Sequence, residues 1–317
     1  MVTILTHSNR KRDPEHTSWS EIKAFETEMI DNFDDQTISL GHDEIDFNQL
    51  NQQPSNLFIF ATGIIDDELK ESVEKSSANI FIVIQDPNWP TDVRIDKPYA
   101  LITPFKALDK MSAKDAYEKL KLVTPNIQIN KPEKHIYLPF GNMSITSRYY
   151  AKQRSLTQYT SIHKTSNIVY AGSLKEDRKD LFIKLVNAYP DVDFIGNFDS
   201  TGFKKMTGIE CNVLHFKGRR PANQVTFIQR IYDKIAIMPD RKMIELDVSY
   251  IRYIEMYLSD AEIILFAEDD MQNQAHEIME KNANVLPNGS YKMNNDKLIA
   301  NYGLMPDMIK SKLKGSY

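Results

Sequence analysis

The sequence predicts an α/β fold in which two doubly wound parallel sheets form separate domains. Short apolar runs alternate with longer amphipathic patterns over most of the 317 residues. The runs NLFIF (Asn56–Phe60) and IFIVI (Ile80–Ile84) have no polar face, as expected for parallel strands covered on both sides. A polar stretch rich in Ser and Thr, residues 142–167, interrupts the alternation. We therefore expect two domains, residues 1–150 and 151–304, and a C-terminal helix, 305–317, that packs back on the first.

The first half predicts strands wherever a short β-rich apolar run ends in a turn signal, and helices where apolar residues recur at helical spacing. In the first helix, for example, Ile22, Phe25 and Met29 recur at about that spacing. The expected strands are Val2–His7, Thr37–Leu40, Asn56–Thr62, Asn79–Gln85, Tyr99–Thr103 and His135–Pro139. The expected helices are Ser20–Phe33, Asp66–Lys75 and Ala113–Val123.

The same alternation resumes in the second half. The expected strands are Ile168–Ala171, Val192–Ile195, Asn212–Phe216, Lys234–Met238 and Ala261–Phe266. The expected helices are Leu174–Tyr189, Pro221–Tyr232, Ser249–Asp260 and Asn295–Lys314, the last interrupted near Gly303 and Pro306. Because the two sheets are expected to face a central cleft, the loops at the carboxyl ends of their strands are the places where ligands bind.

Composition excludes several classes of protein. Apolar residues make up 41% of the chain and charged residues 26%, as in globular proteins that do not enter a membrane. No apolar run reaches the roughly 18 residues of a membrane span, and the N-terminus lacks the order of a signal peptide. The single cysteine, Cys211, excludes an internal disulfide and Cys-rich metal sites. We expect a monomer in a reducing cytoplasm.

The absence of several known sequence motifs argues against further classes of enzyme. The 11 glycines form no Gly-rich phosphate loop, which argues against P-loop NTPases and common dinucleotide enzymes. The seven histidines show no zinc-binding spacing, and no G-x-S-x-G motif is present. The net charge of −5 gives no overall attraction to nucleic acid, so DNA binding requires a local basic patch. Candidate patches are Arg10-Lys11-Arg12, Lys204-Lys205 and Arg219-Arg220, each of which also fits a solvated surface.

A first candidate site follows the strand Ile168–Ala171. Gly172 and Ser173 are small enough to let an anion approach the backbone, and we expect a helix to begin near Ser173. Lys175 and Arg178 would lie in its first turn, where the helix dipole disfavours positive charge. A bound phosphate would resolve that conflict. The same pattern also fits an ordinary strand-to-helix turn with solvated charges.

A second candidate lies in the apolar helix Ser249–Asp260. Arg252 and Glu255 are three residues apart and share one helix face. They fit either a buried ion pair or a site in which Arg252 binds a phosphate and Glu255 accepts hydrogen bonds from a ribose.

Two acidic residues are candidates for catalysis or substrate binding. Asp86 follows a buried strand, where a carboxylate can serve as a general base, but an Asp before Pro is also a common turn residue. Glu21 opens the first long helix, where an acid favours the helix dipole in any case.

Taken together, these stretches resemble the DNA β-glucosyltransferases of T-even bacteriophages, which have the GT-B fold. The likeness rests on Ser20-Glu21, on Asp86, on VYAGSLK (Val169–Lys175) and on the R-x-x-E helix with Arg252 and Glu255, in the same order and at similar spacing. It spans most of the chain and is strongest in the second half. It departs at Lys175, where the family has an arginine.

The resemblance implies a donor, an acceptor and residue roles. A UDP-sugar would bind the second domain, with Lys175, Arg178 and Arg252 on its phosphates, Glu255 on its ribose and the loop at Gly218-Arg219 beside the uracil. Glu21 would bind the sugar, and Asp86 would deprotonate the hydroxymethyl group of 5-hydroxymethylcytosine or 5-hydroxymethyluracil in double-stranded DNA, with inversion at the sugar. A divalent cation, Mg²⁺ or Mn²⁺, would assist, although no dedicated metal ligands stand out. The setting would be an infected bacterial host.

The sequence is also compatible with two other functions. One is a GT-B transferase whose acceptor is a small molecule, a glycan or a protein. The other is a non-catalytic protein that binds nucleotide-sugars or DNA, because fold alone does not determine function.

Overall fold

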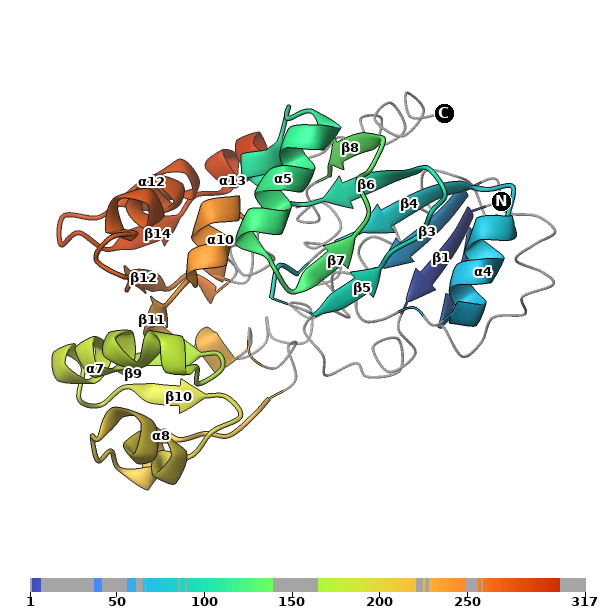
Figure 1. Cartoon of the computed structure of the whole chain (residues 1–317). Helices are drawn as coiled ribbons and strands as arrows, with labels where there is room; N and C mark the ends of the chain where they lie inside the picture. Colours follow the sequence, from blue (N-terminus) through green and yellow to red (C-terminus); the bar gives the residue numbers. More distant parts are fainter. Residues whose placement is uncertain are drawn as a thin grey trace. The chain divides into compact units, whose positions relative to one another are not determined.

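The computed structural model describes residues 2–6, 37–41, 56–60, 65, 67–84, 86–88, 90–138, 165–220, 225, 228–248, 256–257 and 259–302 (Figure 1). The chain divides into two compact units. The first comprises Met1–Ile145, Glu245–Ser249 and Tyr302–Tyr317, and the second comprises Thr146–Ile244 and Tyr250–Asn301. The roles expected for the two domains, and the packing of segment 305–317, stay predictions, since that segment lies outside the described residues.

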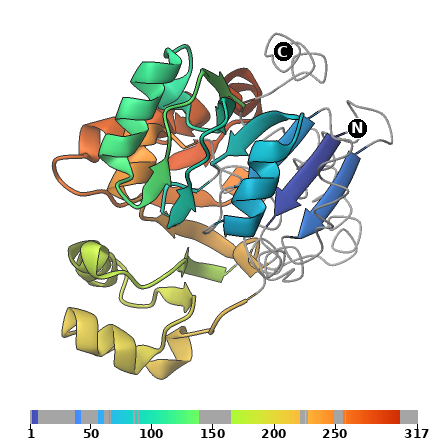
Figure 2. The ribbon, with the colours of Figure 1, turned by 45° about the vertical axis from the view of Figure 1, so that its right-hand side comes forward.

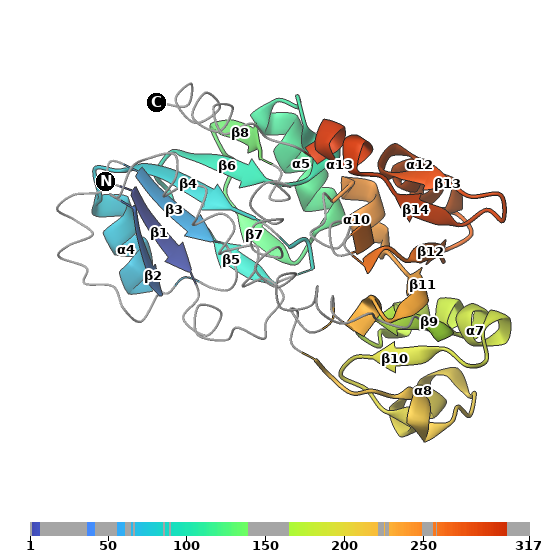
Figure 3. The same cartoon turned by 180° about the vertical axis from the view of Figure 1, so that it is seen from behind.

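The first unit contains a six-stranded parallel sheet with the order β2-β1-β3-β4-β6-β8 (Figures 1 and 3). Its strands are β1 (Val2–Thr6), β2 (Thr37–Gly41), β3 (Asn56–Phe60), β4 (Asn79–Val83), β6 (Tyr99–Thr103) and β8 (Lys134–Tyr137). All five residues of β3 and residues 80–83 of β4 are buried, which confirms the expectation that these two strands are covered on both sides. The strand β6 is buried along its whole length as well. A separate pair joins β5 (Thr91–Val93) and β7 (Ile127–Ile129), which the sequence pattern did not reveal.

Two helices of this unit follow the predicted ranges closely. The helix α4 (Asp67–Lys75) lies against the sheet and buries Leu69 and Val73 (Figure 2). The helix α5 (Ala113–Val123) begins where Ser112 accepts a hydrogen bond from the backbone N–H of Asp115, a side-chain cap that satisfies a helix-terminal donor. A short 3₁₀ turn, η2 (Lys106–Leu108), precedes it. The helix expected at Ser20–Phe33 lies outside the described residues.

The first four strands of the second sheet have the same order as those of the first sheet, and a hairpin takes the place of the last two. Its sheet runs β10-β9-β11-β12-β14-β13, parallel as far as β12 and antiparallel from β14. The strands are β9 (Thr165–Ala171), β10 (Asp193–Ile195), β11 (Tyr232–Ile237), β12 (Glu262–Leu265), β13 (Ala283–Val285) and β14 (Tyr291–Met293). The hairpin turns at Asn288-Gly289, with Gly289 at φ +80°, a conformation that favours glycine.

An aromatic core holds the helices of this unit on its sheet. The helices α7 (Lys179–Ala188) and α8 (Ser200–Thr207) pack on β9 and β10 through Phe182 and Phe203, whose rings meet edge to face 5.8 Å apart. A second cluster joins α10 (Arg241–Leu246) to α12 (Gln272–Asn282). The helix α13 (Asn295–Tyr302) follows the hairpin.

Several elements of the second unit differ from the expectations. The expected helix Leu174–Tyr189 begins five residues later, at Lys179, after a 3₁₀ turn, η3 (Glu176–Arg178), and the expected start near Ser173 is wrong. The acidic residues at 176, 177 and 180 favour a helix N-terminus at this later point. The expected strand Asn212–Phe216 is instead a 3₁₀ turn, η4 (Val213–His215), with one bridge from Phe216 to Phe194. Tyr232, expected to end a helix, begins β11.

Candidate functional site

The second sheet has a topological switch point between β9 and β11. The chain leaves β9 to form β10 on one side and then returns to form β11 on the other side, and both pairs are parallel. The two connections therefore diverge at the carboxyl ends of β9 and β11. In open α/β sheets this is the place where ligands bind. The residues that follow these two strands are Gly172–Arg178 and Met238–Asp240.

Two glycines bring the backbones after β9 and β10 close together at this edge. The N–H of Gly172 donates to the carbonyl of Ile195 over 3.0 Å. A Cβ added at Gly196 would lie 2.2 Å from the carbonyl oxygen of Gly172, so only glycine fits there without a shift. A Cβ at Gly172 would meet the ring of Tyr170, whose hydroxyl donates to the carbonyl of Ser173. The absence of a side chain at Gly196 thus lets two segments of the chain approach each other, and the approach of an anion to Gly172 and Ser173 stays a prediction.

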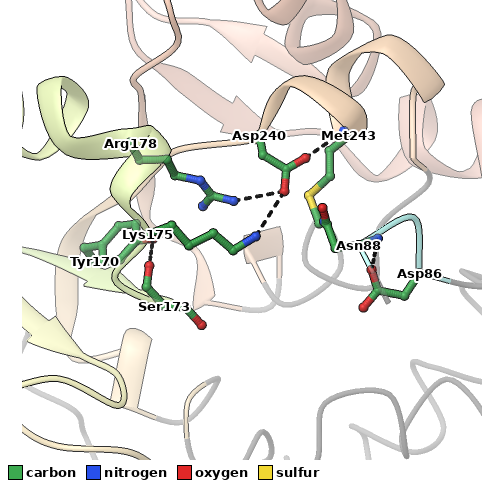
Figure 4. Close-up of polar contacts among 8 residues, drawn as sticks. All are labelled: Asp86, Asn88, Tyr170, Ser173, Lys175, Arg178, Asp240 and Met243. Carbon is green, nitrogen blue, oxygen red and sulfur yellow. Dashed lines mark hydrogen bonds and ion pairs between the residues drawn. The ribbon is translucent and has the colours of Figure 1, made fainter. Parts of the chain in front are cut away.

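Lys175 and Arg178 converge on one buried carboxylate (Figure 4). Nη2 of Arg178 donates to Oδ2 of Asp240 over 3.0 Å, and Nζ of Lys175 lies 3.4 Å from the same oxygen. Asp240 is only 6% exposed. The two cations come from the loop after β9 and the carboxylate from the loop after β11, so the cluster straddles the switch point. Its two positive charges against one negative charge can bind an anion.

The helix start changes how these two cations should be interpreted. Lys175 and Arg178 precede the first turn of α7, and Arg178 is its N-cap residue. Arg178 still lies at the N-terminal end of α7, where the dipole disfavours positive charge, and Asp240 partly neutralises both side chains. The anion-binding hypothesis now depends on the two cations that meet at Asp240 and no longer on a helix N-terminus.

Gly218 and Arg219 lie on an exposed loop that runs toward the same edge. Phe216 pairs in parallel with Phe194 of β10, and the N–H of Lys217 donates to the carbonyl of Phe194 over 2.8 Å. The next two residues therefore continue in the direction of the carboxyl end of β10. Gly218 has φ +70°, which favours glycine at this turn.

The buried Asp193 fixes the base of this loop. Its carboxylate accepts from the hydroxyl of Tyr232 over 2.6 Å and lies 2.9 Å from Nδ1 of His215 and 3.4 Å from Nζ of Lys217. Burial, together with the hydrogen bond to this carboxylate and its negative charge, raises the pKa of Tyr232 well above its ordinary value.

Asp86 follows β4 of the first sheet, in which β1 and β3 flank the corresponding switch point. Its Oδ1 accepts from the N–H of Asn88 over 2.8 Å (Figure 4). This is the local turn expected of an Asp before Pro. Among the described residues Oδ2 makes no hydrogen bond, and the side chain is half-buried. The turn fixes the orientation of the carboxylate through Oδ1, and the role of Asp86 as a base stays a prediction.

Several predicted site residues lie outside the described residues: Glu21, Arg252, Glu255, Arg10, Lys11 and Arg12. Their roles stay predictions. Among the described residues there is no group of three or more His, Cys, Asp or Glu side chains that could hold a metal ion. No helix in that part of the chain is long and apolar enough to cross a membrane.

Sequence reasoning did not single out Asp240 or its neighbour Arg241. Nη2 of Arg241 pairs with Asp270 at 2.6 Å and with Glu268 at 2.8 Å, in the loop after β12. The guanidinium holds the pKa of Asp270 below its usual range. Both residues lie in the loop directly after the predicted strand Lys234–Met238, where ligand-binding residues are expected, but the local sequence does not reveal that Asp240 pairs with Lys175 and Arg178.

Comparison by sequence finds no matching family model and no matching curated protein. Comparison of structures finds the β-glucosyltransferase of phage T4 (BGT). A mutant in complex with UDP-glucose matches at 16% identity and TM-score 0.57 over 99% of this chain and 96% of that one. A complex with UDP and Mn²⁺ matches at 16% and 0.58 over 98% and 99%.

A third structure, described as the DNA-modifying enzyme with and without uridine diphosphoglucose, matches at 16% identity and TM-score 0.56 over 99% of this chain and 96% of that one. These matches confirm the structural resemblance predicted from the sequence. At 16% identity the likeness shows the fold alone. The chain has the GT-B fold of the phage T4 β-glucosyltransferase, built from two Rossmann-like α/β units.

Proposed function

We propose that this protein is a glycosyltransferase that uses a UDP-sugar. The observation that carries the proposal is the cation cluster at the switch point of the second sheet, in a fold shared over nearly the whole chain with enzymes solved with UDP-glucose and UDP. Lys175 at this point can meet the negative charge of a diphosphate, since its side chain is 35% exposed. Stabilising that charge as the diphosphate departs is the main electrostatic task of such an enzyme.

The acceptor we propose is the hydroxymethyl group of 5-hydroxymethylcytosine, or of 5-hydroxymethyluracil, in double-stranded DNA. Support comes from the DNA-modifying neighbour and from the resemblance at Asp86. Such a base is stacked inside the duplex, so the target nucleotide would flip out to reach the reacting carbon. The donor sugar is glucose or a pentose such as arabinose.

The reaction is a single displacement with inversion. Asp86 takes the proton of the hydroxymethyl group while its oxygen bonds to the anomeric carbon, and the bond from that carbon to the diphosphate breaks. UDP leaves with the bonding electrons. Glu21 binds the sugar hydroxyls, Glu255 binds the ribose, and Arg252 adds positive charge beside the diphosphate. Gly172 and Ser173 provide backbone beside the phosphates, and Gly218 and Arg219 border the uracil.

A divalent cation would add positive charge to the departing diphosphate. One neighbour holds UDP together with Mn²⁺. Among the described residues no group of three or more His, Cys, Asp or Glu side chains could hold such an ion. The roles of Lys175 and Arg178 do not depend on it.

The test mixes the purified protein with hydroxymethylated duplex DNA and a panel of UDP-sugars, followed by mass spectrometry of the nucleosides. We expect a mass increase of one sugar on the hydroxymethylated base, and unmodified DNA serves as the control. No transfer from any UDP donor, to DNA or to water, would reject the proposed activity.

The acidic net charge favours a second candidate, a transferase with a small-molecule, glycan or protein acceptor. The two candidates differ in their response to salt. DNA binding that neutralises phosphates weakens steeply as salt concentration rises, because counterions are released on binding. UDP-sugar turnover without any binding to DNA would favour the second candidate. UDP binding without turnover would favour a non-catalytic protein.

A further inference from the structure

Asp240 is fixed by the backbone that it caps. It directly precedes α10, and its Oδ1 accepts from the N–H of Met243 over 2.9 Å, while its carbonyl accepts from the N–H of Ile244. These contacts leave Oδ2 turned toward the loop after β9, where it accepts from Arg178 and lies 3.4 Å from Nζ of Lys175 (Figure 4). The carboxylate therefore has one oxygen bound to the helix and one oxygen shared by two cations.

The two cations differ in their access to a ligand. The side chain of Arg178 is 10% exposed, and its buried Nε has no hydrogen-bond partner among the residues that the structure describes. The side chain of Lys175 is 35% exposed. A diphosphate that arrives from solvent reaches Lys175 more readily than Arg178. The contacts form a chain in which the buried Arg178 binds Asp240 and Asp240 binds the partly exposed Lys175.

We propose that Asp240 is a positioning residue for sugar transfer: anchored by Arg178, it fixes Nζ of Lys175 where the leaving diphosphate develops its charge. This inference rests on the proposed function and assigns different roles to the two cations, Lys175 and Arg178. Lys175 contacts the diphosphate, and Arg178 acts through Asp240. Without the carboxylate, the flexible lysine side chain would leave the orientation that transition-state stabilisation requires.

The expected effect appears in kcat more than in KM. Without Asp240 the charge of Lys175 remains near the donor, and an opposing negative charge is lost, so ground-state attraction for a UDP-sugar persists. The part that is lost is the fixed orientation, which matters as charge builds on the leaving oxygen. A purely structural role would instead lower the amount of folded protein and leave kcat per folded molecule unchanged.

The experiment compares Asp240→Asn with the wild type in UDP-sugar turnover. Asparagine keeps an oxygen for the N–H of Met243, so the cap is preserved while the charge is removed. We expect kcat to fall about ten-fold or more, with KM for the UDP-sugar changed by less than about three-fold. In a Lys175→Gln background the same change should lower kcat no further, because both variants remove the same interaction.

Asp199→Asn is the matched control, because Asp199 also caps a helix, accepting from the N–H of Gly202 over 2.8 Å, and makes no contact with Lys175 or Arg178. Its kcat should equal that of the wild type. If Asp240→Asn fails to fold, Asp240→Glu replaces it: the charge still pairs with Arg178, but the extra methylene displaces Lys175. This variant should lower kcat several-fold with KM preserved.

The outcomes separate the two proposals. Two results would overturn the role of Asp240: a wild-type kcat in the Asp240 variants, or the same loss of kcat whether or not Lys175 is present. In both cases, UDP release by the wild type would still support the proposed function. Failure of the wild type to bind UDP or to release it from UDP-sugars overturns the proposed function and, with it, the role assigned to Asp240.

Discussion

Arg178 and Asp240 lie 62 residues apart in the sequence, yet Nη2 of Arg178 donates to Oδ2 of Asp240 over 3.0 Å in the interior of the second unit. The contact exists because β9 and β11 are parallel neighbours, which brings their carboxyl ends to one edge of the sheet. It joins the two connections that diverge at the switch point. Stability and the proposed chemistry therefore depend on the same ion pair.

Removing one partner of this pair should destabilise the protein. Breaking a buried ion pair costs about 3–5 kcal/mol of unfolding free energy when the remaining charge has no partner. Arg178→Met should cost up to that amount, because the buried Asp240 keeps its contact with Lys175. Urea denaturation measures the change. The double variant Arg178→Met, Asp240→Asn should recover part of the loss, because no uncompensated charge remains. A double variant whose loss equals the sum of the two single losses would contradict the assignment of a coupled pair.

Asp86→Asn should abolish sugar transfer and leave UDP binding intact. Asparagine keeps an oxygen for the N–H of Asn88, so the turn persists while the proton acceptor is lost. Loss of a general base lowers kcat by about 10²–10⁴-fold. Initial rates of transfer and calorimetry with UDP measure the two properties separately. Asp96→Asn, at an exposed carboxylate of the same unit, serves as the control, and retained transfer in Asp86→Asn would remove Asp86 as the base.

The bounds of a strand or helix were predicted best where the sequence carries a clear local signal, such as an unbroken apolar run or a helix-capping residue. The ranges of β6 and α5 were predicted to the residue, because Tyr99–Thr103 is fully buried and Ser112 caps the following helix. The helix α8 was missed because it presents few apolar residues. Its cap signals were available, however: Asp199 accepts from the N–H of Gly202, and Gly208 ends the helix at φ +78°.

The candidate site was predicted only in part, because its geometry depends on long-range pairing. Gly172, Lys175 and Arg178 were identified because they follow a predicted strand, and ligands bind at the loops after the carboxyl ends of such strands. The partner Asp240 could not be chosen without knowing that β11 returns beside β9. The sequence pattern also placed the helix start too early, since local charge at Lys175 and Arg178 does not reveal a buried carboxylate elsewhere in the chain.

Gly196→Ala should destabilise the second unit strongly. The new Cβ would lie 2.2 Å from the carbonyl oxygen of Gly172 and 2.5 Å from the ring of Phe198, so the backbone after β9 would have to move. Overpacking of this kind costs about 1–3 kcal/mol. Gly202→Ala is the control: its Cβ meets nothing closer than 3.4 Å, and alanine favours the helix, so stability should be unchanged or rise by up to about 1 kcal/mol. Equal thermal stability of the two variants would show that the loops at Gly172 and Gly196 do not approach so closely.

Stability should fall as pH rises above about 10, the ordinary pKa of tyrosine. Burial raises the pKa of Tyr99, and burial together with Asp193 raises that of Tyr232. Above that pH the unfolded chain releases both phenolic protons while the folded protein retains them, so the unfolded state gains stability from ionisation. Urea denaturation between pH 8 and about 11 measures the decline. Tyr99→Phe and Tyr232→Phe, each of which also loses a hydrogen bond at neutral pH, should each make the decline shallower, and an unchanged decline in both variants would show that other groups cause it.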